Sequence, residues 1–350
     1  MAITYPMAVI TAPGKVEFQE KTFSRPGNED VLIKTHAAAI CGSDLHLFKG
    51  LHPSVPLPIT VGHEAAGEVI EIGGSVTKHK IGDRVTVEPV IACGTCYFCE
   101  RGEYNLCTNI SFQYRKGQGA FSPYFVVNQN RAFRLPDNIS YEEGALVEPL
   151  SVAMHAVKKS GLRLGNTSAV FGAGAIGLLV SMLSLQTSGV GSIICDINQY
   201  RLNKALELGA RMAINSRKQD PVKAILEVTG QMGVDKTFEA VGMETTLTQS
   251  LQALKRGGSA TLLGIFEQLD IKLPANLFIQ HEISLLGSQG YSWDFQDGLS
   301  LLSTGRLDLK PLITNRIFLE HLQQGFEMLL DPVNESIKVV VLMDDQAIQI

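Results

Sequence analysis

Between about residues 160 and 290, short apolar runs alternate with longer stretches that have the hydrophobic spacing of helices. This alternation predicts strands joined by crossover helices, and therefore a parallel sheet. The predicted strands cover residues 168–171, 192–196, 211–214, 236–240, 259–264 and 283–287. Six parallel strands are typical of a doubly wound α/β dinucleotide-binding domain.

Glycines are predicted to end two of the crossover helices. The helix in YRLNKALELGA is expected to end at Gly209, and the helix in ETTLTQSLQALKRGG at Gly257. Glycine is favoured at these positions because the residue after a helix often takes a left-handed backbone conformation, which glycine adopts easily.

The first predicted strand runs directly into the turn GAGAIG, which is followed by the apolar helix LLVSMLSL. Glycines in such a turn allow a tight bend and a close approach of the backbone to a pyrophosphate, which the helix N-terminus then binds. The motif alone is weak evidence, but here it has the strand before it and the helix after it. The predicted phosphate-binding residues are Gly172, Gly174, Ala175, Ile176 and Gly177.

Asp196 ends the second predicted strand, nineteen residues after Gly177. An acidic residue at this position accepts hydrogen bonds from the ribose 2′-hydroxyl of NAD and repels the 2′-phosphate of NADP. The sequence therefore favours NAD, although Arg201 would weaken that preference.

The chain has 350 residues, of which 45% are apolar and 19% charged, with a formal net charge of −5. At about 100 to 200 residues per domain, this length suggests two domains. The sequence has no basic stretch, which argues against nucleic acid and favours a small-molecule partner. It also has no signal-peptide pattern and no long apolar run, so we expect no membrane association and a cytoplasmic location.

Four of the six cysteines, Cys93, Cys96, Cys99 and Cys107, fall within fifteen residues with the spacing C-x2-C-x2-C-x7-C. In a reducing compartment, clustered thiols are more often metal ligands than disulfides. Four thiolates close a zinc tetrahedron and leave no position for a substrate, so we expect a structural zinc. An iron–sulfur cluster is the alternative, but the C-x3-C-P continuation of the ferredoxin run is missing.

A second candidate metal site combines Cys41, His63, Glu64 and Glu148. Thiolate, imidazole and carboxylate are all zinc ligands, and residues spread this widely can be gathered only by the fold. Their spacing alone does not establish a site.

The strings CGSDLH, GHEAAGEVIEIG and GDRV, the four-cysteine segment and EPLSVAMHA follow one another along the chain. In this order they resemble the zinc-dependent medium-chain alcohol and polyol dehydrogenases. The resemblance implies a mainly β, GroES-like catalytic domain that carries the structural-zinc lobe and into which the dinucleotide-binding domain is inserted. The expected boundaries are 1–151 for the catalytic domain, 152–289 for the NAD-binding Rossmann domain, and 290–350 for the return to the catalytic domain.

The same resemblance implies one catalytic and one structural zinc per subunit, with Cys41 and His63 binding the catalytic ion. One of the two carboxylates, Glu64 or Glu148, would coordinate the catalytic zinc directly. The other would coordinate it either directly or through a water molecule. Neighbouring residues of a strand point to opposite faces, so His63 and Glu64 can share a metal only if the backbone turns there.

The resemblance also implies roles for three residues that follow Cys41 in the sequence. Ser43 would contact the alcohol oxygen, His46 would pass the proton on to solvent, and Asp44 would orient a histidine ligand of the zinc. His155 is expected to pack beside the site, and Cys195 to be a core thiol. The segments expected at the nicotinamide end contain Val241, Gly242, Gly264, Ile265, Phe266, Gly287 and Ser288.

The stretch EEGALVEPLSVAMHA most resembles the sorbitol and related polyol dehydrogenases. Two departures put the substrate in doubt. Leu47 stands where those enzymes often carry a tyrosine near the substrate, and Gly290 stands where many of them carry an arginine that binds substrate or cofactor. A different polyol, a sugar acid or a smaller diol then becomes a candidate, with Phe112 and Arg115 as candidate pocket residues.

These features together predict hydride transfer from a secondary alcohol of a polyol or sugar derivative to NAD, giving the ketone. Oxidation of L-threonine or 2,3-butanediol is the alternative within the enzyme class. A non-catalytic, crystallin-like nucleotide-binding protein is the alternative outside it, and the pair Cys41 and His63 argues against that reading. The resemblance also implies a homo-oligomer, either a dimer or a tetramer.

Overall fold

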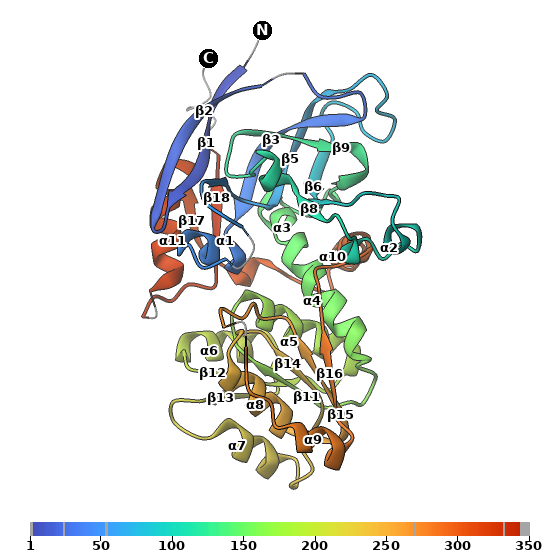
Figure 1. Cartoon of the computed structure of the whole chain (residues 1–350), viewed down its shortest axis with the longest axis vertical. Helices are drawn as coiled ribbons and strands as arrows, with labels where there is room; N and C mark the ends of the chain where they lie inside the picture. Colours follow the sequence, from blue (N-terminus) through green and yellow to red (C-terminus); the bar gives the residue numbers. More distant parts are fainter. Residues whose placement is uncertain (1–2, 24, 53–54, 269, 332, 344–350) are drawn as a thin grey trace. The chain divides into compact units, whose positions relative to one another are not determined.

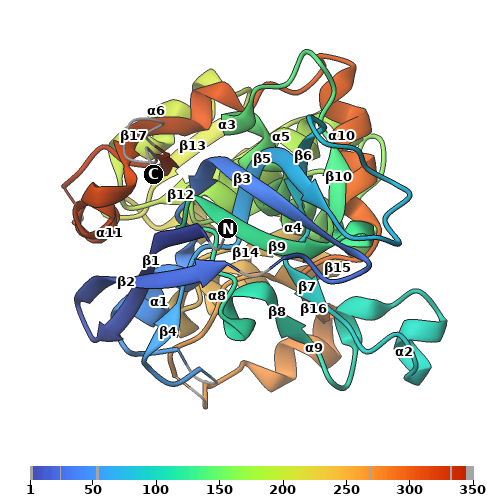
Figure 2. The same cartoon turned by 90° about the horizontal axis from the view of Figure 1, so that it is seen from above.

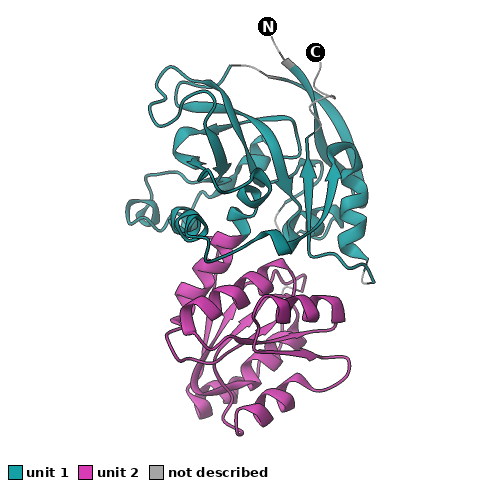
Figure 3. Ribbon diagram, turned by 180° about the vertical axis from the view of Figure 1, so that it is seen from behind, with its two compact units in different colours: residues 1–149, 292–350 teal, residues 150–291 magenta. Residues whose placement is uncertain are grey.

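A computed structural model describes residues 3–23, 25–52, 55–268, 270–331 and 333–343. The chain divides into two compact units (Figure 3). Unit 1 consists of Met1–Pro149 together with Ser292–Ile350, and unit 2 consists of Leu150–Tyr291.

Unit 2 is built on a six-stranded parallel sheet, which confirms the predicted fold class (Figure 1). The strand order is β13-β12-β11-β14-β15-β16, so the chain runs outward from β11 to one edge and then from β14 to the other. Because parallel crossovers are right-handed, this reversal places helices on both faces of the sheet. The strands are β11 (Ser168–Phe171), β12 (Ser192–Asp196), β13 (Met212–Asn215), β14 (Val234–Glu239), β15 (Leu254–Leu262) and β16 (Ser284–Gly287).

The helices of this unit are α5 (Ala175–Ser188), α6 (Gln199–Glu207), α7 (Pro221–Val228), α8 (Glu244–Gln252) and α9 (Ala275–His281). A further helix, α4 (Val147–Ser160), begins in unit 1 and continues into unit 2. Cys195 lies in β12 with 2% of its surface exposed and packs in the core of the sheet.

One of the two predicted helix ends is confirmed and the other is wrong. Gly209 has a φ of 91° directly after the C-cap Leu208 of α6, which is the expected conformation. Helix α8 instead ends at Gln252, and Gly257 lies inside β15 with a φ of 75°. The register between β14 and β15 jumps here, so Gly257 supplies the left-handed conformation of a bulge rather than of a helix end.

Unit 1 contains a seven-stranded sheet, seen from above in Figure 2. Its main path is β10-β6-β5-β3-β18-β17, and β9 also pairs with β3. The strands are β3 (Asp30–Ala39), β5 (Glu64–Ile72), β6 (Arg84–Val87), β9 (Tyr124–Asn128), β10 (Ala132–Arg134), β17 (Ile313–Phe318) and β18 (Lys338–Leu342).

Strand β3 is the centre of this unit. One of its edges pairs with β5, and the other pairs first with β9 and then with β18. Residues that come after unit 2 in the chain therefore complete the sheet that carries the candidate site. Alternate buried positions of these strands, including Ile33, Val69 and Val339, form the main apolar core.

The smaller elements of unit 1 surround this sheet. They are the sheet of β2 (Lys15–Phe23), β1 (Ile3–Ala12) and β4 (Ile59–Thr60), the pair β7 (Val90–Ile91) and β8 (Ser111–Phe112), the α-helices α1 (Gly42–Phe48), α2 (Tyr97–Glu100), α3 (Tyr141–Ala145), α10 (Asp294–Ser303) and α11 (Leu322–Leu330), and the 3-10 turns η1 (Tyr104–Leu106), η2 (Gln113–Lys116), η3 (Gln129–Arg131), η4 (Lys310–Leu312) and η5 (Leu319–His321). Of the helices formed by the described residues, none has the length and apolar character needed to span a membrane.

Candidate active site and metal centres

Cys41, His63 and Glu64 come together in unit 1. One potential ligand atom from each lies within 4.8 Å of the other two. Gly62 has a φ of 90° and β5 begins only at Glu64, so His63 lies in the turn before the strand. This turn allows two residues that are adjacent in sequence to face the same point.

Helix α1 positions the groups around this cluster. Cys41 is its N-cap residue, and the Asp44 Oδ2 atom accepts a 3.0 Å hydrogen bond from the Cys41 backbone N–H. The other oxygen, Oδ1, lies 3.4 Å from His63 Nδ1. On the opposite side of the imidazole, Ser43 Oγ lies 3.5 Å from His63 Nε2. Asp44 is fully buried, so its carboxylate fixes both the ring and the thiol-bearing backbone.

The electrostatic environment of the cluster favours positive charge. Burial lowers the pKa of His63, but the negative charges of Asp44 and Cys41 outweigh burial and raise that pKa well above its ordinary value. A buried site that stabilises a cation and combines thiolate, imidazole and carboxylate donors fits a zinc ion. The three residues would hold the metal, with Asp44 orienting the histidine from behind.

Lys338 is a member of the site that the sequence motifs did not reveal. Its ammonium Nζ lies 2.6 Å from Glu64 Oε1 and 2.5 Å from Oε2, and it donates a 3.0 Å hydrogen bond to the Ile40 carbonyl. Burial lowers the pKa of Lys338, whereas the charges of Glu64, Cys41 and Glu148 together raise it above its usual range. A buried lysine therefore balances part of the negative charge of the cluster.

Two other predicted site residues lie outside the three-residue group. Glu148 is 6% exposed and lies in the first turn of α4, close enough to Lys338 to raise its pKa. His46 lies in the last turn of α1, one turn after Ser43. The turn that follows is closed by a hydrogen bond from the Leu51 N–H to the His46 carbonyl, and it brings His52 near His46.

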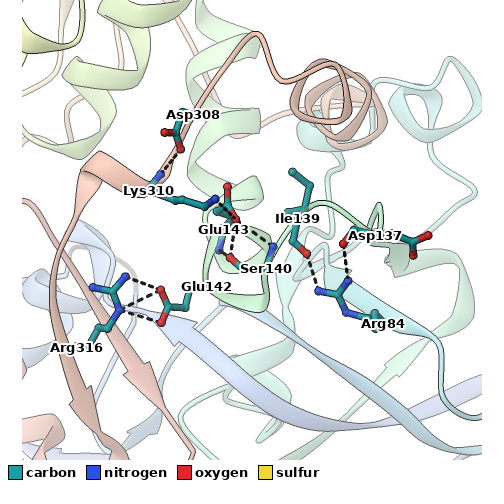
Figure 4. A network of polar contacts seen from close by, with 9 residues as sticks. All are labelled: Arg84, Asp137, Ile139, Ser140, Glu142, Glu143, Asp308, Lys310 and Arg316. Carbon is teal, nitrogen blue, oxygen red and sulfur yellow. Dashed lines mark hydrogen bonds and ion pairs between the residues drawn. The ribbon is translucent and has the colours of Figure 1, made fainter.

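Helix α3, which ends just before α4 begins, is held by a network of polar contacts (Figure 4). Ser140 and Glu143 form a reciprocal capping box at its N-terminus. Arg316 of β17 binds both carboxylate oxygens of Glu142, with N–O distances between 2.7 and 3.1 Å. Arg84 of β6 donates a 2.5 Å hydrogen bond to the Ile139 carbonyl just before the helix. The start of α4, and with it Glu148, is thereby tied to strands from both segments of unit 1.

The four clustered cysteines also converge, with one sulfur from each within 4.8 Å of the others. Two backbone N–H groups, those of Cys93 and Asn109, donate to Cys107 Sγ at 3.3 and 3.4 Å. Backbone hydrogen bonds from Cys99 and Thr108 lower the pKa of Cys96 to about 6, whereas desolvation and the neighbouring thiols raise the pKa of Cys99 to about 12. Four thiols this close can ionise together only around a cation, so the donor set fits a closed metal site.

The cysteine lobe is fastened to the return segment of unit 1 through Trp293. Its indole Nε1 donates to the Gly102 carbonyl at 2.9 Å, and its backbone N–H donates to Tyr104 Oη at 2.8 Å. The Ser292 hydroxyl donates to the same Gly102 carbonyl. Gly102 and Tyr104 lie between Cys99 and Cys107, so these contacts depend on the folded lobe.

In unit 2, each glycine of the turn between β11 and α5 meets a different steric condition. A Cβ on Gly177 would lie 1.8 Å from the Gly172 carbonyl oxygen, and one on Gly172 would lie 2.7 Å from the Val241 side chain. A Cβ on Gly174 would meet nothing within 4 Å. Gly172 and Gly177 are therefore required by packing, whereas Gly174 adjoins open space at the N-terminus of α5. Such a cradle fits the pyrophosphate of a dinucleotide.

Asp196 ends β12 as predicted, and its carboxylate is held within the glycine turn. Oδ2 accepts a 2.6 Å hydrogen bond from Ala173 N–H, and Oδ1 accepts a 2.8 Å hydrogen bond from Asn198 N–H. The negative charge is thus fixed beside the phosphate cradle.

The predicted segments after the later strands meet at the same edge of the sheet. A Cβ on Gly264 would lie 2.2 Å from Gly242 N, so the two turns are in close contact. Glu239, which the sequence motifs did not reveal, accepts hydrogen bonds from Val241 N–H and Gly242 N–H at 3.0 and 2.9 Å. The buried hydroxyl of Ser288 has no hydrogen-bond partner among the described residues.

Two positions at which the chain departs from the polyol dehydrogenases have different surroundings. Leu47 is 1% exposed and packs in the core of unit 1. Gly290 has a φ of 50°, a conformation that glycine adopts without strain.

Comparison with known proteins gives one family match in the first part of the chain and a second match in its later part. Residues 27–137 match the alcohol dehydrogenase GroES-like domain, and residues 175–304 match the zinc-binding dehydrogenase family. The chain is 38% identical to sorbitol dehydrogenase of Bacillus subtilis over 319 residues, which cover 90% of each chain. The family of the chain follows from these matches. The chain belongs to the zinc-dependent medium-chain alcohol and polyol dehydrogenases.

Solved structures of this dehydrogenase family share the complete fold. The 2R,3R-butanediol dehydrogenase of Bacillus subtilis superposes with a TM-score of 0.88 at 34% identity, covering 97% of this chain and 100% of the other. A protein of Sinorhizobium meliloti described as a zinc-binding dehydrogenase, in a structure that holds NADP, gives a TM-score of 0.90 at 31% identity, with 97% and 99% covered. The chain is therefore an oxidoreductase of a family that uses zinc and a nicotinamide cofactor.

Proposed function

We propose that this polyol dehydrogenase oxidises a secondary alcohol of a polyol or sugar derivative to the ketone, with NAD as the hydride acceptor. The observation that carries the proposal is the convergence of Cys41, His63 and Glu64 beside the Ser43 hydroxyl. Bound in this shell, zinc would supply a Lewis acid that makes a substrate hydroxyl more acidic.

The residues of the chain then have distinct tasks. Glu64 is the third protein ligand, because it reaches the point shared by Cys41 and His63, and Glu148 lies outside that group. Ser43 receives the substrate proton, and His46, one helical turn further along, passes it to solvent. These assignments predict that Cys41→Ser abolishes turnover and leaves NAD binding intact.

The cofactor preference rests on Asp196. Its carboxylate, held by two backbone N–H groups, accepts the ribose hydroxyls of NAD and repels a 2′-phosphate. Because the structure of the S. meliloti relative holds NADP, the cofactor preference of this chain needs a direct test. The kcat/KM ratio should favour NAD in the native enzyme and shift toward NADP in Asp196→Ser. A native preference for NADP would overturn the role of Asp196.

We also propose two zinc ions per chain, one at each cluster, and a homo-oligomer in the cytoplasm. The six free thiols suit a reducing compartment. Metal analysis of the purified protein should give two zinc ions per chain, falling to one in Cys96→Ser. The mass in solution will show whether the oligomer is a dimer or a tetramer.

Oxidation of 2,3-butanediol is a second candidate, supported by the 34% identity to the butanediol dehydrogenase. Steady-state turnover of sorbitol, xylitol, 2,3-butanediol and L-threonine with NAD separates the two candidates. Nucleotide binding without turnover of any of these alcohols, by zinc-loaded protein, would instead indicate the non-catalytic function.

A further inference from the structure

Arg115 carries a positive charge close to the candidate metal cluster. It lies in η2, and its guanidinium carbon is 5.6 Å from the ring centre of Phe112 and 6.0 Å from that of Tyr114. The Tyr114 ring is in turn 5.8 Å from the ring of His63. Only one side chain therefore separates the guanidinium from a candidate zinc ligand.

The aromatic wall that holds Arg115 is itself fixed. The rings of Phe112 and Tyr114 stack with their centres 5.6 Å apart, and Tyr114 is buried. Thr60 donates a 2.5 Å hydrogen bond to the Tyr114 carbonyl, and the Gln113 N–H donates to the Pro89 carbonyl at 2.9 Å. These contacts anchor the backbone directly before Arg115.

One buried donor of Arg115 is not used by the described part of the protein. Its Nε–H group is buried without a hydrogen-bond partner, and the described residues pair no carboxylate with its guanidinium. The nearby Asp44 carboxylate already binds the Cys41 backbone and adjoins His63. An arginine whose buried Nε–H group has no partner is suited to bind an anion from outside the chain.

Two histidines lie near Arg115, and the Asp44 carboxylate also reaches this region. The turn after α1 brings His52 and His46 to the same region, and the Arg115 charge lowers the pKa of His52 in addition to the effect of its burial. A neutral polyol has no group that would use the positive charge of Arg115, whereas a phosphate or carboxylate would pair with it.

We propose that Arg115 is a specificity-determining residue that binds the anionic end of the substrate, so that the preferred substrate is a polyol bearing a phosphate or a carboxylate. The proposal rests on the proposed polyol oxidation and narrows its substrate class. In this arrangement the hydroxyl to be oxidised would lie at the metal cluster, and the charged group would pair with the guanidinium.

The test compares D-sorbitol, D-sorbitol 6-phosphate and D-gluconate as substrates of the zinc-loaded native enzyme, Arg115→Gln and Lys116→Gln. Lys116 is the matched control, because it is exposed, carries the same charge and lines a separate cavity of about 560 Å³ with residues such as Asp30 and Arg131. Arg115→Gln should raise KM for the phosphate or the acid by about tenfold to a hundredfold, as expected for loss of a charge-assisted hydrogen bond. Its KM for sorbitol, and all constants of Lys116→Gln, should remain unchanged.

The two anionic substrates separate phosphate from carboxylate recognition, and Arg115→Lys should restore part of the lost affinity. Equal kcat/KM for sorbitol and both anionic substrates in the native enzyme, or an unchanged ratio in Arg115→Gln, would overturn the proposal while polyol oxidation stands.

A binding measurement keeps the proposal testable if no substrate is turned over. D-sorbitol 6-phosphate or D-gluconate should raise the unfolding temperature of the native protein more than sorbitol does, and this difference should vanish in Arg115→Gln. Failure of turnover together with Arg115-dependent protection would reject the proposed reaction and support the anion site. Failure of both would reject both.

Discussion

Single glycines in the turn before α5 have separable roles. Gly177→Ala places a methyl group 1.8 Å from the Gly172 carbonyl oxygen, so the helix must shift. We expect it to lower the free energy of unfolding by about 1–3 kcal/mol, the usual range for overpacking. Gly174→Ala meets no atom within 4 Å and should change stability by less than about 0.5 kcal/mol, yet weaken NAD binding by occupying the phosphate cradle.

Chemical denaturation and calorimetric NAD titration check this pair of variants. If Gly174→Ala destabilised the protein as strongly as Gly177→Ala, the distinction between a packing glycine and a ligand-facing glycine would fail.

Lys338 gives a second prediction for a single residue. Lys338→Met leaves the buried Glu64 carboxylate without its cation, which typically costs about 3–5 kcal/mol. Zinc at the same cluster would compensate part of the negative charge, so the loss should be larger in metal-free protein than in zinc-loaded protein. Thermal unfolding of both forms measures the difference, and Lys338→Arg is the charge-preserving control. A loss that does not depend on zinc would show that Lys338 acts only through packing.

The cysteine lobe allows a prediction for a whole element, because Trp293 is the single tryptophan of the chain. Its indole is bonded to Gly102 and packs edge-on against Tyr104, with ring centres 5.7 Å apart. Removing the lobe zinc should unfold the lobe and break these contacts. Because Trp293 is already 68% exposed, the change should appear in its near-ultraviolet circular dichroism rather than as a large shift of its emission maximum. Cys96→Ser should show this spectrum before any chelator is added, whereas Cys195→Ser, altered in a core strand of the other unit, should not.

The acidity of Cys96 sets the pH dependence of zinc binding by the lobe. Above pH 6 this thiol is already a thiolate, since its pKa is lowered to about 6. Zinc binding then releases protons only from the other cysteines. Below about pH 6, Cys96 must also lose a proton, so the fall of zinc affinity with decreasing pH should steepen by one proton. Competition titrations with a chelator from pH 5 to about pH 8 measure this slope.

Variants at helix α3 test how firmly the start of α4 is held. Ser140→Ala removes the capping hydroxyl, which usually contributes about 1 kcal/mol. Arg316→Gln breaks a bidentate pair that is 47% exposed on the arginine side, so its cost should stay below about 1 kcal/mol. Urea unfolding should therefore rank Ser140→Ala as the more destabilising change, and the reverse order would make Arg316 the main anchor.

For the molecule as a whole, each unit should respond to its own ligand. Hydrogen exchange with NAD should slow mainly in unit 2, around α5 and the end of β12, whereas zinc removal should speed exchange mainly in unit 1. The same change in both units with either ligand would show that they unfold as a single cooperative body.

The parts of the enzyme that sequence predicts well are those encoded locally. The glycine turn, Asp196 and the four cysteines each lie within a short segment whose spacing has a direct chemical meaning. Lys338 and Glu64 are 274 positions apart, and they meet because β18 and β5 both pair with β3. The bulge at Gly257 was missed for a related reason, because a left-handed glycine after a helical pattern has the same local signature at a helix end and in a strand.

The late position of β18 in the chain also affects the order in which the enzyme folds during its synthesis on the ribosome. Strand β3 is synthesised long before β18, and all of unit 2 is made between them. Until Lys338 has emerged, the nascent chain holds the Glu64 carboxylate without its buried cation. Unit 2 can therefore fold during translation, but the candidate zinc centre matures only when the last strand enters the sheet.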